Sequence, residues 1–236
     1  MSLIDIIALA LFTVCWLLYQ PAVKHLSREV GAINTDMTVV RRRWMANMSR
    51  RENRFLDSQL MGHALNSASH FSSANLILIA AATGALFRSD ATYRAVEHMV
   101  ATDTGPRWLF EGKLALVVLT LARGLLDFIW AIRQMNYTLA AVGAAPPVTC
   151  PPAVLAAYGE AAADVLNPAL SSFNNGVRGY YFALAAASWM LGPWAMIAAV
   201  LLAVVLLYTR QVSSSAARGV RRIRQIIDGL DAPPPV

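Results

Sequence analysis

The sequence predicts an all-α, polytopic membrane protein with about five transmembrane helices and helical extensions into the cytoplasm. Of its 236 residues, 57% are hydrophobic and 14% are charged, whereas about a quarter of the residues in a soluble domain are charged. The apolar residues gather in long runs, and the segments between the runs differ strongly in their Lys and Arg content. Length and composition of these runs are typical of membrane spans.

The first predicted span covers residues 3–19. No basic residue precedes it, and the first positive charges, Lys24 and Arg28, follow it. A secretory signal peptide has its basic residues before its apolar segment. We therefore expect an uncleaved span with the N-terminus outside.

The second and third predicted spans cover residues 71–87 and 108–132. Residues 20–64 contain eight Lys and Arg, residues 88–107 three, residues 133–178 two and residues 209–236 five. Because positive charges stay on the cytoplasmic side, the richest segment is expected inside, and the next two alternate outside and inside.

The apolar run from Tyr180 to Leu207 is interrupted by Gly192 and Pro193. As one helix its 28 residues would reach about 42 Å, against a hydrocarbon core of about 30 Å. A turn at Gly-Pro gives two spans, residues 176–191 and 194–208, and keeps the arginines after residue 209 inside. The alternative is four spans, with the last one kinked at Pro193.

These spans define one helical membrane domain, residues 1–210. Residues 211–236 form a basic cytoplasmic tail with a Pro-rich end. The predicted location is a bacterial inner membrane, with several passes and the C-terminus in the cytoplasm.

A basic segment follows the first span, with no Gly or Pro between Thr38 and Met61, and we expect it to be one helix that runs on through residue 79. It would lie on the inner leaflet with its tryptophan at the interface and its arginines near anionic phospholipids. The alternative is that these charges only orient the loop. The candidate lipid contacts are Arg41, Arg42, Arg43, Trp44, Arg50, Arg51 and Arg54.

The third span carries charges well inside an apolar run. Thr120, Arg123, Asp127 and Gln134 recur at helical spacing and share one face. Arg123 lies about 15 Å of helical rise from Arg133, near the middle of the membrane. Charged groups there either hold helices in register or line a polar path. The candidate partners on the fourth span are Asn174, Asn175 and Arg178.

Enzyme and cofactor signatures are scarce. The sequence has no G-x-S-x-G, H-E-x-x-H, P-loop or dinucleotide motif. His63 and His70 are seven residues apart without a second pair, and Cys15 and Cys150 are expected to be free thiols. We expect no cofactor, no metal and no nucleic-acid partner.

Several motifs resemble the uncharacterised integral membrane family known as domain of unknown function 599. They are "IDIIALALFTVCWLLY", "RRRWM", "RENRFLDSQL", "IRQMNYT", "GAAPP" and "YYFALAA" followed by Pro193 and Trp194. The likeness covers most of residues 1–210. It implies a helical membrane protein and carries no assigned activity or functional residue.

Three functional hypotheses follow. The first is a structural or accessory membrane protein, expected to be a homo-oligomer because small residues on the last two spans permit close helix packing. The second is an oligomeric channel or transporter with a polar path near Arg123 and Asp127. The third, a lipid-acting membrane enzyme, has no motif to support it.

Overall fold

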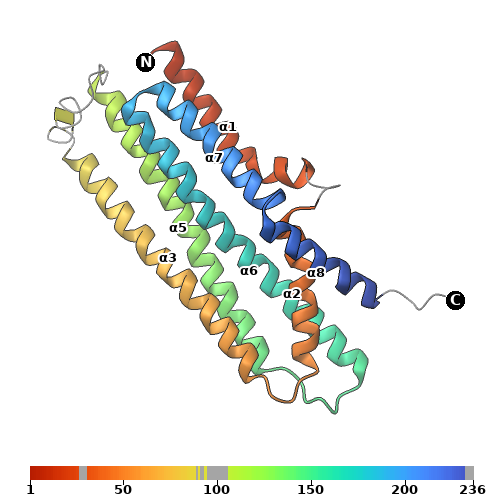
Figure 1. Ribbon diagram of the computed structural model, residues 1–236. Coiled ribbons are helices and arrows are strands. Elements are labelled where there is room, and N and C mark those ends of the chain that lie inside the picture. The colour runs from red at the N-terminus through yellow and green to blue at the C-terminus, as the bar shows by residue number, and fades with distance from the viewer. Residues whose placement is uncertain (27–30, 89, 91–92, 95–105, 232–236) are drawn as a thin grey trace. The chain divides into compact units, whose positions relative to one another are not determined.

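The computed structural model describes residues 1–26, 31–88, 90, 93–94 and 106–231, and within this part the chain contains helices and no strand (Figure 1). The Pro-rich end predicted at 232–236 lies outside the described residues. A 3₁₀ turn, Ser188–Leu191, precedes the helix that begins at Pro193. The α-helices are α1 (Leu3–Leu26), α2 (Ile33–Ser49), α3 (Phe55–Phe87), α5 (Arg107–Gly143), α6 (Pro152–Ala187), α7 (Pro193–Val212) and α8 (Ser215–Asp231).

The predicted fold class is confirmed. Among the described residues, four helical stretches are long and apolar enough to cross a membrane: Leu3–Val23, Phe55–Phe87, Arg107–Gly143 and Pro193–Leu230, the last of which contains α7 and α8. The chain is therefore a multi-pass helical membrane protein.

The chain divides into two compact units. Unit 1 consists of Met1–Val23, Phe71–Asp127 and Asn175–Leu207, and unit 2 of Lys24–His70, Phe128–Asn174 and Tyr208–Val236. The predicted spans fall almost entirely within unit 1, whereas the arginine-rich segments after the first and last spans belong to unit 2.

Unit 1 is held together by aromatic packing and by close helix approach. Phe12 on α1 meets Phe182 on α6 edge to face, with ring centroids 6.0 Å apart, and both side chains are fully buried. A Cβ on Gly179 of α6 would lie 3.4 Å from the Cα of Gly124 on α5, so these glycines allow the two backbones to touch. Asn75 on α3 donates to the carbonyl of Leu121 over 2.8 Å.

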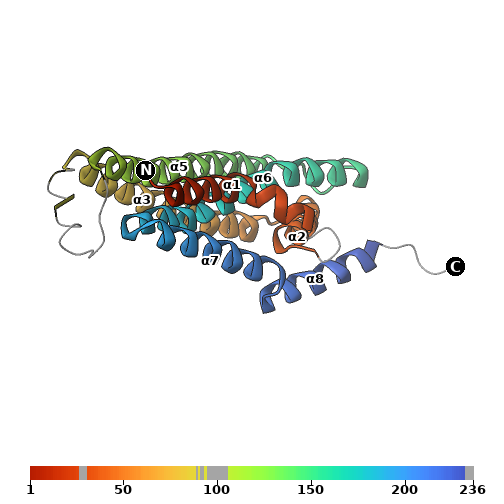
Figure 2. The same cartoon turned by 90° about the horizontal axis from the view of Figure 1, so that it is seen from above.

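Gly192 and Pro193 form a turn between two helices. Gly192 has φ of 120°, which other residues rarely adopt, and Pro193 is the first residue of α7, where its missing N–H costs no hydrogen bond. In Figures 1 and 2, α7 runs back from the end at which α6 stops. A single helix kinked at Pro193 is therefore wrong, because α6 and α7 are separate helices joined by a turn. The number of membrane crossings, four or five, stays a prediction.

The basic segment is not one continuous helix, which corrects that expectation. α2 ends at Ser49 and α3 begins at Phe55. Side-chain contacts fix this break where no Gly or Pro marks it: Asn53 accepts a hydrogen bond from the backbone N–H of Phe55, and Arg54 donates to carbonyls across the turn. α2 and the first part of α3, up to His70, are therefore two separate helical segments of unit 2.

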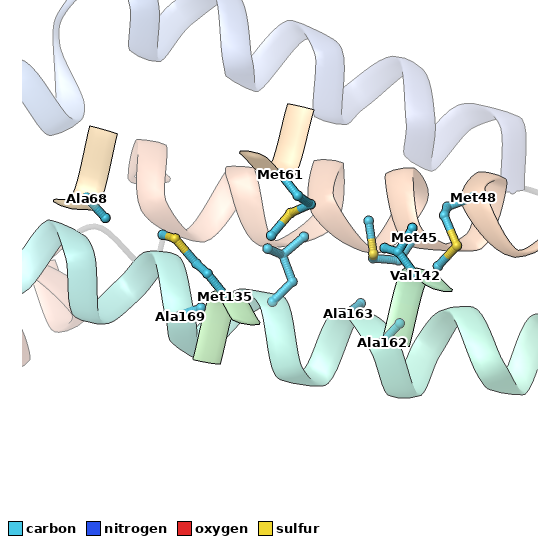
Figure 3. Close-up of a cluster of buried hydrophobic side chains, with 10 residues drawn as sticks. Met45, Met48, Met61, Ala68, Met135, Val142, Ala162, Ala163 and Ala169 are labelled. Carbon is cyan, nitrogen blue, oxygen red and sulfur yellow. The ribbon is translucent and has the colours of Figure 1, made fainter. Parts of the chain in front are cut away.

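The core of unit 2 is rich in methionine and alanine. Figure 3 shows Met45 and Met48 of α2, Met61 of α3 and Met135 of α5 gathered with small residues of α6, among them Ala163. Flexible methionines fill the irregular space that alanines on α6 leave. α8 packs against α2 in the same unit (Figure 2).

Candidate functional site

Four of the predicted polar residues meet in one recess of unit 1. The recess has a volume of about 340 Å³ and is bounded by α1, α5 and α6. We call it the polar recess. Its lining residues are Trp16, Leu17, Gln20, Leu119, Arg123, Asp127, Asn175, Arg178, Gly179 and Phe182.

Helical spacing explains why each helix presents a pair of these side chains. Arg123 and Asp127 are four residues apart on α5, and Asn175 and Arg178 are three apart on α6. Residues three or four apart share one face of a helix. The contact between Gly124 and Gly179 lies beside the recess and lets the two polar faces come close.

Arg178 is anchored by both its neighbours and its own helix. Its guanidinium donates to the side-chain oxygen of Asn175 over 2.6 Å and to that of Gln20 on α1 over 3.0 Å. The guanidinium carbon also lies 5.4 Å from the ring centroid of Tyr19, in a cation–π contact. Arg178 is thus a fixed part of the wall.

Arg123 is held less tightly. Its Nε donates to Oδ2 of Asp127 over 3.4 Å, a long contact for a charged pair. The side chain of Arg123 is 65% exposed, whereas that of Asp127 is 19% exposed. The carboxylate therefore lies in the wall, and the guanidinium of Arg123 reaches the opening.

The lining carries two guanidinium groups and one carboxylate, and hence one net positive charge. The carboxylate of Asp127 interacts electrostatically with both Arg123 and Arg178. A net positive recess with amide and indole groups favours an anion, because guanidinium groups bind carboxylate and phosphate through paired hydrogen bonds.

The other predicted polar residues lie elsewhere. Thr120 is fully buried and donates to the carbonyl of Leu116 in its own helix over 2.8 Å. Gln134 and Asn174 belong to unit 2, where Gln134 accepts from Ser172 over 3.4 Å and Asn174 donates to Asn34 over 2.9 Å. These three side chains make contacts within the chain.

Trp16 and Gln20 are recess residues that the sequence analysis missed. They are four residues apart on α1, so they lie on one face, as the pairs on α5 and α6 do. The available signal is Gln20 itself, a polar residue at the end of an apolar run and just before Pro21.

Part of the predicted lipid-contacting segment makes contacts inside unit 2. The Asp57 carboxylate is fully buried and accepts from Trp44 Nε1 over 2.7 Å and from Arg51 over 2.6 Å. Arg54 donates to the carbonyls of Ala145 and Pro146. Three segments that carry the family resemblance, "RRRWM", "RENRFLDSQL" and "GAAPP", are therefore joined by two sets of hydrogen bonds, one around Asp57 and one around Arg54.

The remaining predicted lipid contacts differ in exposure. Arg41 is buried, and burial lowers the pKa of its guanidinium. Arg42 pairs with Asp164 over 3.1 Å at an exposed position, Arg43 is half-buried, and Arg50 is exposed. Lipid contact by this segment stays a prediction, and Arg42 and Arg50 are the side chains best exposed for it.

A second charged cluster lies in unit 1, at the end where α6 turns into α7. Asp5 on α1 accepts from Ser2 and, over 2.9 Å, from Nε1 of Trp189. The ammonium of buried Lys113 lies 5.6 Å from the centroid of the Trp189 ring. This cluster joins α1, α5 and the turn after α6, and the carboxylate of Asp5 is held by Ser2 and Trp189 within it.

Candidate metal ligands and comparisons with known proteins complete the description of the site. No group of three or more His, Cys, Asp or Glu side chains within the described residues could hold a metal ion. Neither the curated proteins nor the solved structures compared with the chain give a match. One family profile matches residues 7–216, which is most of the chain. The resemblance is thereby confirmed, and the protein belongs to the family described as protein of unknown function, DUF599.

Proposed function

We propose that the protein binds an anionic group in the polar recess and that transport of a small anionic solute is its function. One observation carries this proposal. Charged and amide side chains from α1, α5 and α6 surround an open space of about 340 Å³ in an apolar unit. Charged residues among membrane helices are costly, and in many proteins they mark a path for ions or substrates.

The charge of the recess selects the class of solute. Two arginines face one aspartate, so a bound carboxylate or phosphate would bring the site close to neutrality. Arg123, with its 65% exposed side chain, is the group that would meet the anion first. Arg178, Gln20 and Asn175 would then hold it by hydrogen bonds or position the groups that do.

The second candidate is the structural or accessory membrane protein. The contacts of Thr120, Gln134 and Asn174 favour it, since all three side chains are used within the chain. In this reading the Arg123–Asp127 pair only holds helices together. Assembly of several copies is part of both candidates, and light scattering of the detergent-solubilised protein measures it.

The proposed topology has five crossings with the N-terminus outside. The division into units supports it, because unit 1 holds parts of all five proposed crossings. The first of them, Leu3–Val23, has 21 residues and would span about 31 Å, close to the thickness of a hydrocarbon core, whereas α6 is not among the four described stretches long and apolar enough to cross. α6 is the proposed fourth crossing. It is less apolar than the other crossings because Asn175 and Arg178 lie at its end of unit 1.

The proposed topology also predicts the depth of the polar recess in the membrane. Gln20, Asp127 and Asn175 lie where α1, α5 and α6 leave unit 1 for unit 2 along the chain. With unit 2 in the cytoplasm, the recess would lie near the inner boundary of the hydrocarbon and not at the middle of the membrane. It would then be an inward-facing site.

Cysteine accessibility in intact cells tests the topology. Single cysteines at Leu191 and Ser213 are introduced into a Cys15→Ala, Cys150→Ala background and treated with a membrane-impermeant thiol reagent. Position 191 is used because a cysteine at the neighbouring Gly192 would be strained, since residues with a side chain rarely adopt its φ of 120°. Labelling at 191 with protection at 213 is expected. The reverse pattern contradicts the proposed orientation.

Flux measurements test the function. Proteoliposomes are loaded with phosphate, succinate or chloride, and anion efflux is compared between the wild-type protein and Arg123→Gln. A large loss of flux with unchanged thermal stability supports transport. If Arg123→Gln releases each anion as fast as the wild-type protein does, the transport proposal is overturned. A variant that loses stability and assembly instead supports the structural role.

Tryptophan fluorescence adds a direct binding measurement. Trp16 lines the recess, so binding of an anion there should change its emission. Titration with phosphate and with succinate is compared between the wild-type protein and Trp16→Phe. Loss of the signal in Trp16→Phe assigns binding to the recess, whereas an equal signal in both proteins places it elsewhere.

A further inference from the structure

α8 presents an apolar face that no helix of its unit covers. Ile223, Ile226 and Leu230 are 48%, 60% and 67% exposed. They recur at spacings of three and four, so they form one stripe along the helix. An exposed stripe of large aliphatic side chains in an otherwise polar helix is typical of a surface that binds another apolar phase.

The opposite side of α8 is fixed to α2. Arg224 donates to the carboxylate of Asp36 over 2.8 Å, and Arg221 lies 3.9 Å from the same carboxylate and donates to the carbonyl of Gly31. Asp36 is 1% exposed, and its hydrogen bond raises the pKa of Arg224. Because these contacts set the rotation of the helix, the apolar stripe is held outward, away from α2.

The polar side of α8 that remains exposed is basic. Arg218 and Arg222 are exposed, four residues apart, and lie beside the apolar stripe. A helix with exposed aliphatic residues on one face and arginines along its edge is typical of helices that lie in the headgroup region of a bilayer. The arginines are placed to meet the negative charge of anionic lipids.

The chain itself brings α8 to a membrane surface. α7 is the apolar part of a membrane span, and only Ser213 and Ser214 separate its last residue, Val212, from the first residue of α8. Ser214 accepts a hydrogen bond from the backbone N–H of Ala217, which starts the new helix directly after the span. α8 therefore begins where α7 leaves the hydrocarbon.

We propose that α8 is an interfacial helix that inserts Ile223, Ile226 and Leu230 into the bilayer surface at the end of α7 and binds anionic lipid headgroups through Arg218 and Arg222. Pairing of two copies through the same stripe is disfavoured, because it would bring two sets of arginines together. The proposal does not depend on the polar recess or on the direction in which the chain crosses the membrane.

The test uses full-length protein, one copy per lipid nanodisc, with the background Cys15→Ala, Cys150→Ala. Ile226→Cys carries an environment-sensitive fluorophore on the apolar stripe. Gln225→Cys is the matched control, because the adjacent residue is also exposed but lies on the polar side. Nitroxide-labelled lipids and aqueous iodide serve as quenchers, in phosphatidylcholine with and without phosphatidylglycerol.

The expected result is strong lipid quenching and weak iodide quenching at position 226, increased by phosphatidylglycerol, with the opposite pattern at 225. Equal iodide quenching at both positions in anionic nanodiscs overturns the proposal. Protection from both quenchers at 226 also overturns it, because a protein surface and not lipid would then cover the stripe.

A second variant tests the contribution of the exposed arginines while keeping the contacts that anchor the helix. Arg218→Gln, Arg222→Gln removes the exposed arginines and leaves Arg221, Arg224 and Asp36 in place. Each arginine near an anionic surface is worth roughly a fivefold change in the binding equilibrium, so the response to phosphatidylglycerol should largely disappear. An unchanged response in a helix that circular dichroism shows to be intact contradicts the role of these arginines.

Discussion

Arg178 on α6 and Gln20 on α1 are joined by a hydrogen bond of 3.0 Å across the polar recess. The same guanidinium is held by Asn175 and faces the ring of Tyr19. Arg123 has one long contact, to Asp127, and a side chain that is 65% exposed. The two arginines of the recess therefore have different physical roles, and substitution should separate them.

Arg178→Met should destabilise the protein more than Arg123→Gln does. Loss of Arg178 leaves the side-chain oxygens of Gln20 and Asn175 without their donor, which costs about 1–3 kcal/mol. Arg123→Gln should stay within about 0.5 kcal/mol, as for most exposed positions. Unfolding in detergent micelles measures both, and equal losses would contradict the distinction.

Gly159→Ala should destabilise unit 2. A Cβ at this position would lie 2.7 Å from the Cα of Ala46 and 2.9 Å from the carbonyl oxygen of Met45, both backbone atoms of α2. Overpacking of this kind costs about 1–3 kcal/mol. Gly62→Ala is the control, because nothing lies within 4 Å of its Cβ, and a helical alanine there should be neutral or stabilising.

Asp57→Ala should cost far more stability than Arg42→Gln. The carboxylate of Asp57 is fully buried and accepts from Trp44 and Arg51, and hydrogen bonds to a charged group contribute about 1.5–3 kcal/mol. Arg42 and its partner Asp164 are both more than half exposed, and such pairs are worth about 0–1 kcal/mol. Chemical denaturation of the two variants measures the difference, and a larger loss for Arg42→Gln would be inconsistent with the burial of Asp57.

Asp36→Asn should release α8 from α2. The substitution weakens the contacts with Arg221 and Arg224, so trypsin should cut α8 faster than in the wild-type protein. Asp228→Asn is the control, because Asp228 is 55% exposed and pairs with Arg224 within α8 only. Equal cleavage rates for the wild-type protein and Asp36→Asn would show that other contacts between α8 and α2, and not Asp36, hold the helix.

Helical spacing and composition predict much of this structure. The long apolar runs predict the helices of unit 1, and Gly192 with Pro193 predicts the turn, because both features are local properties of the chain. Spacings of three and four also identify four polar recess residues before any contact is known. These signals lie within one helix or one turn.

Contacts between distant segments are harder to predict. The break between α2 and α3 involves hydrogen bonds of Arg54, two of them to carbonyls more than ninety residues away, and the local signal, Asn53 just before α3, is weak by itself. Gln134 and Asn174 continue the polar faces of α5 and α6, but they belong to unit 2. Helical periodicity predicts which residues share a face and does not predict where along the helix a recess ends. Gln20 reaches the recess through a contact between α1 and α6, which the periodicity of α1 alone does not reveal.

The turn at Gly192 also bears on how the chain enters a membrane during synthesis. Between Tyr180 and Tyr208 the sequence has no charged residue. The tip of this helical hairpin, Leu191 to Trp194, consists of two apolar residues and the Gly-Pro pair that makes the turn. A hairpin of this kind needs no charge to be carried across the hydrocarbon. In the proposed five-crossing topology, both of its arms would therefore be inserted together as one unit, and the arginines of α8 would stay on the side from which the hairpin entered.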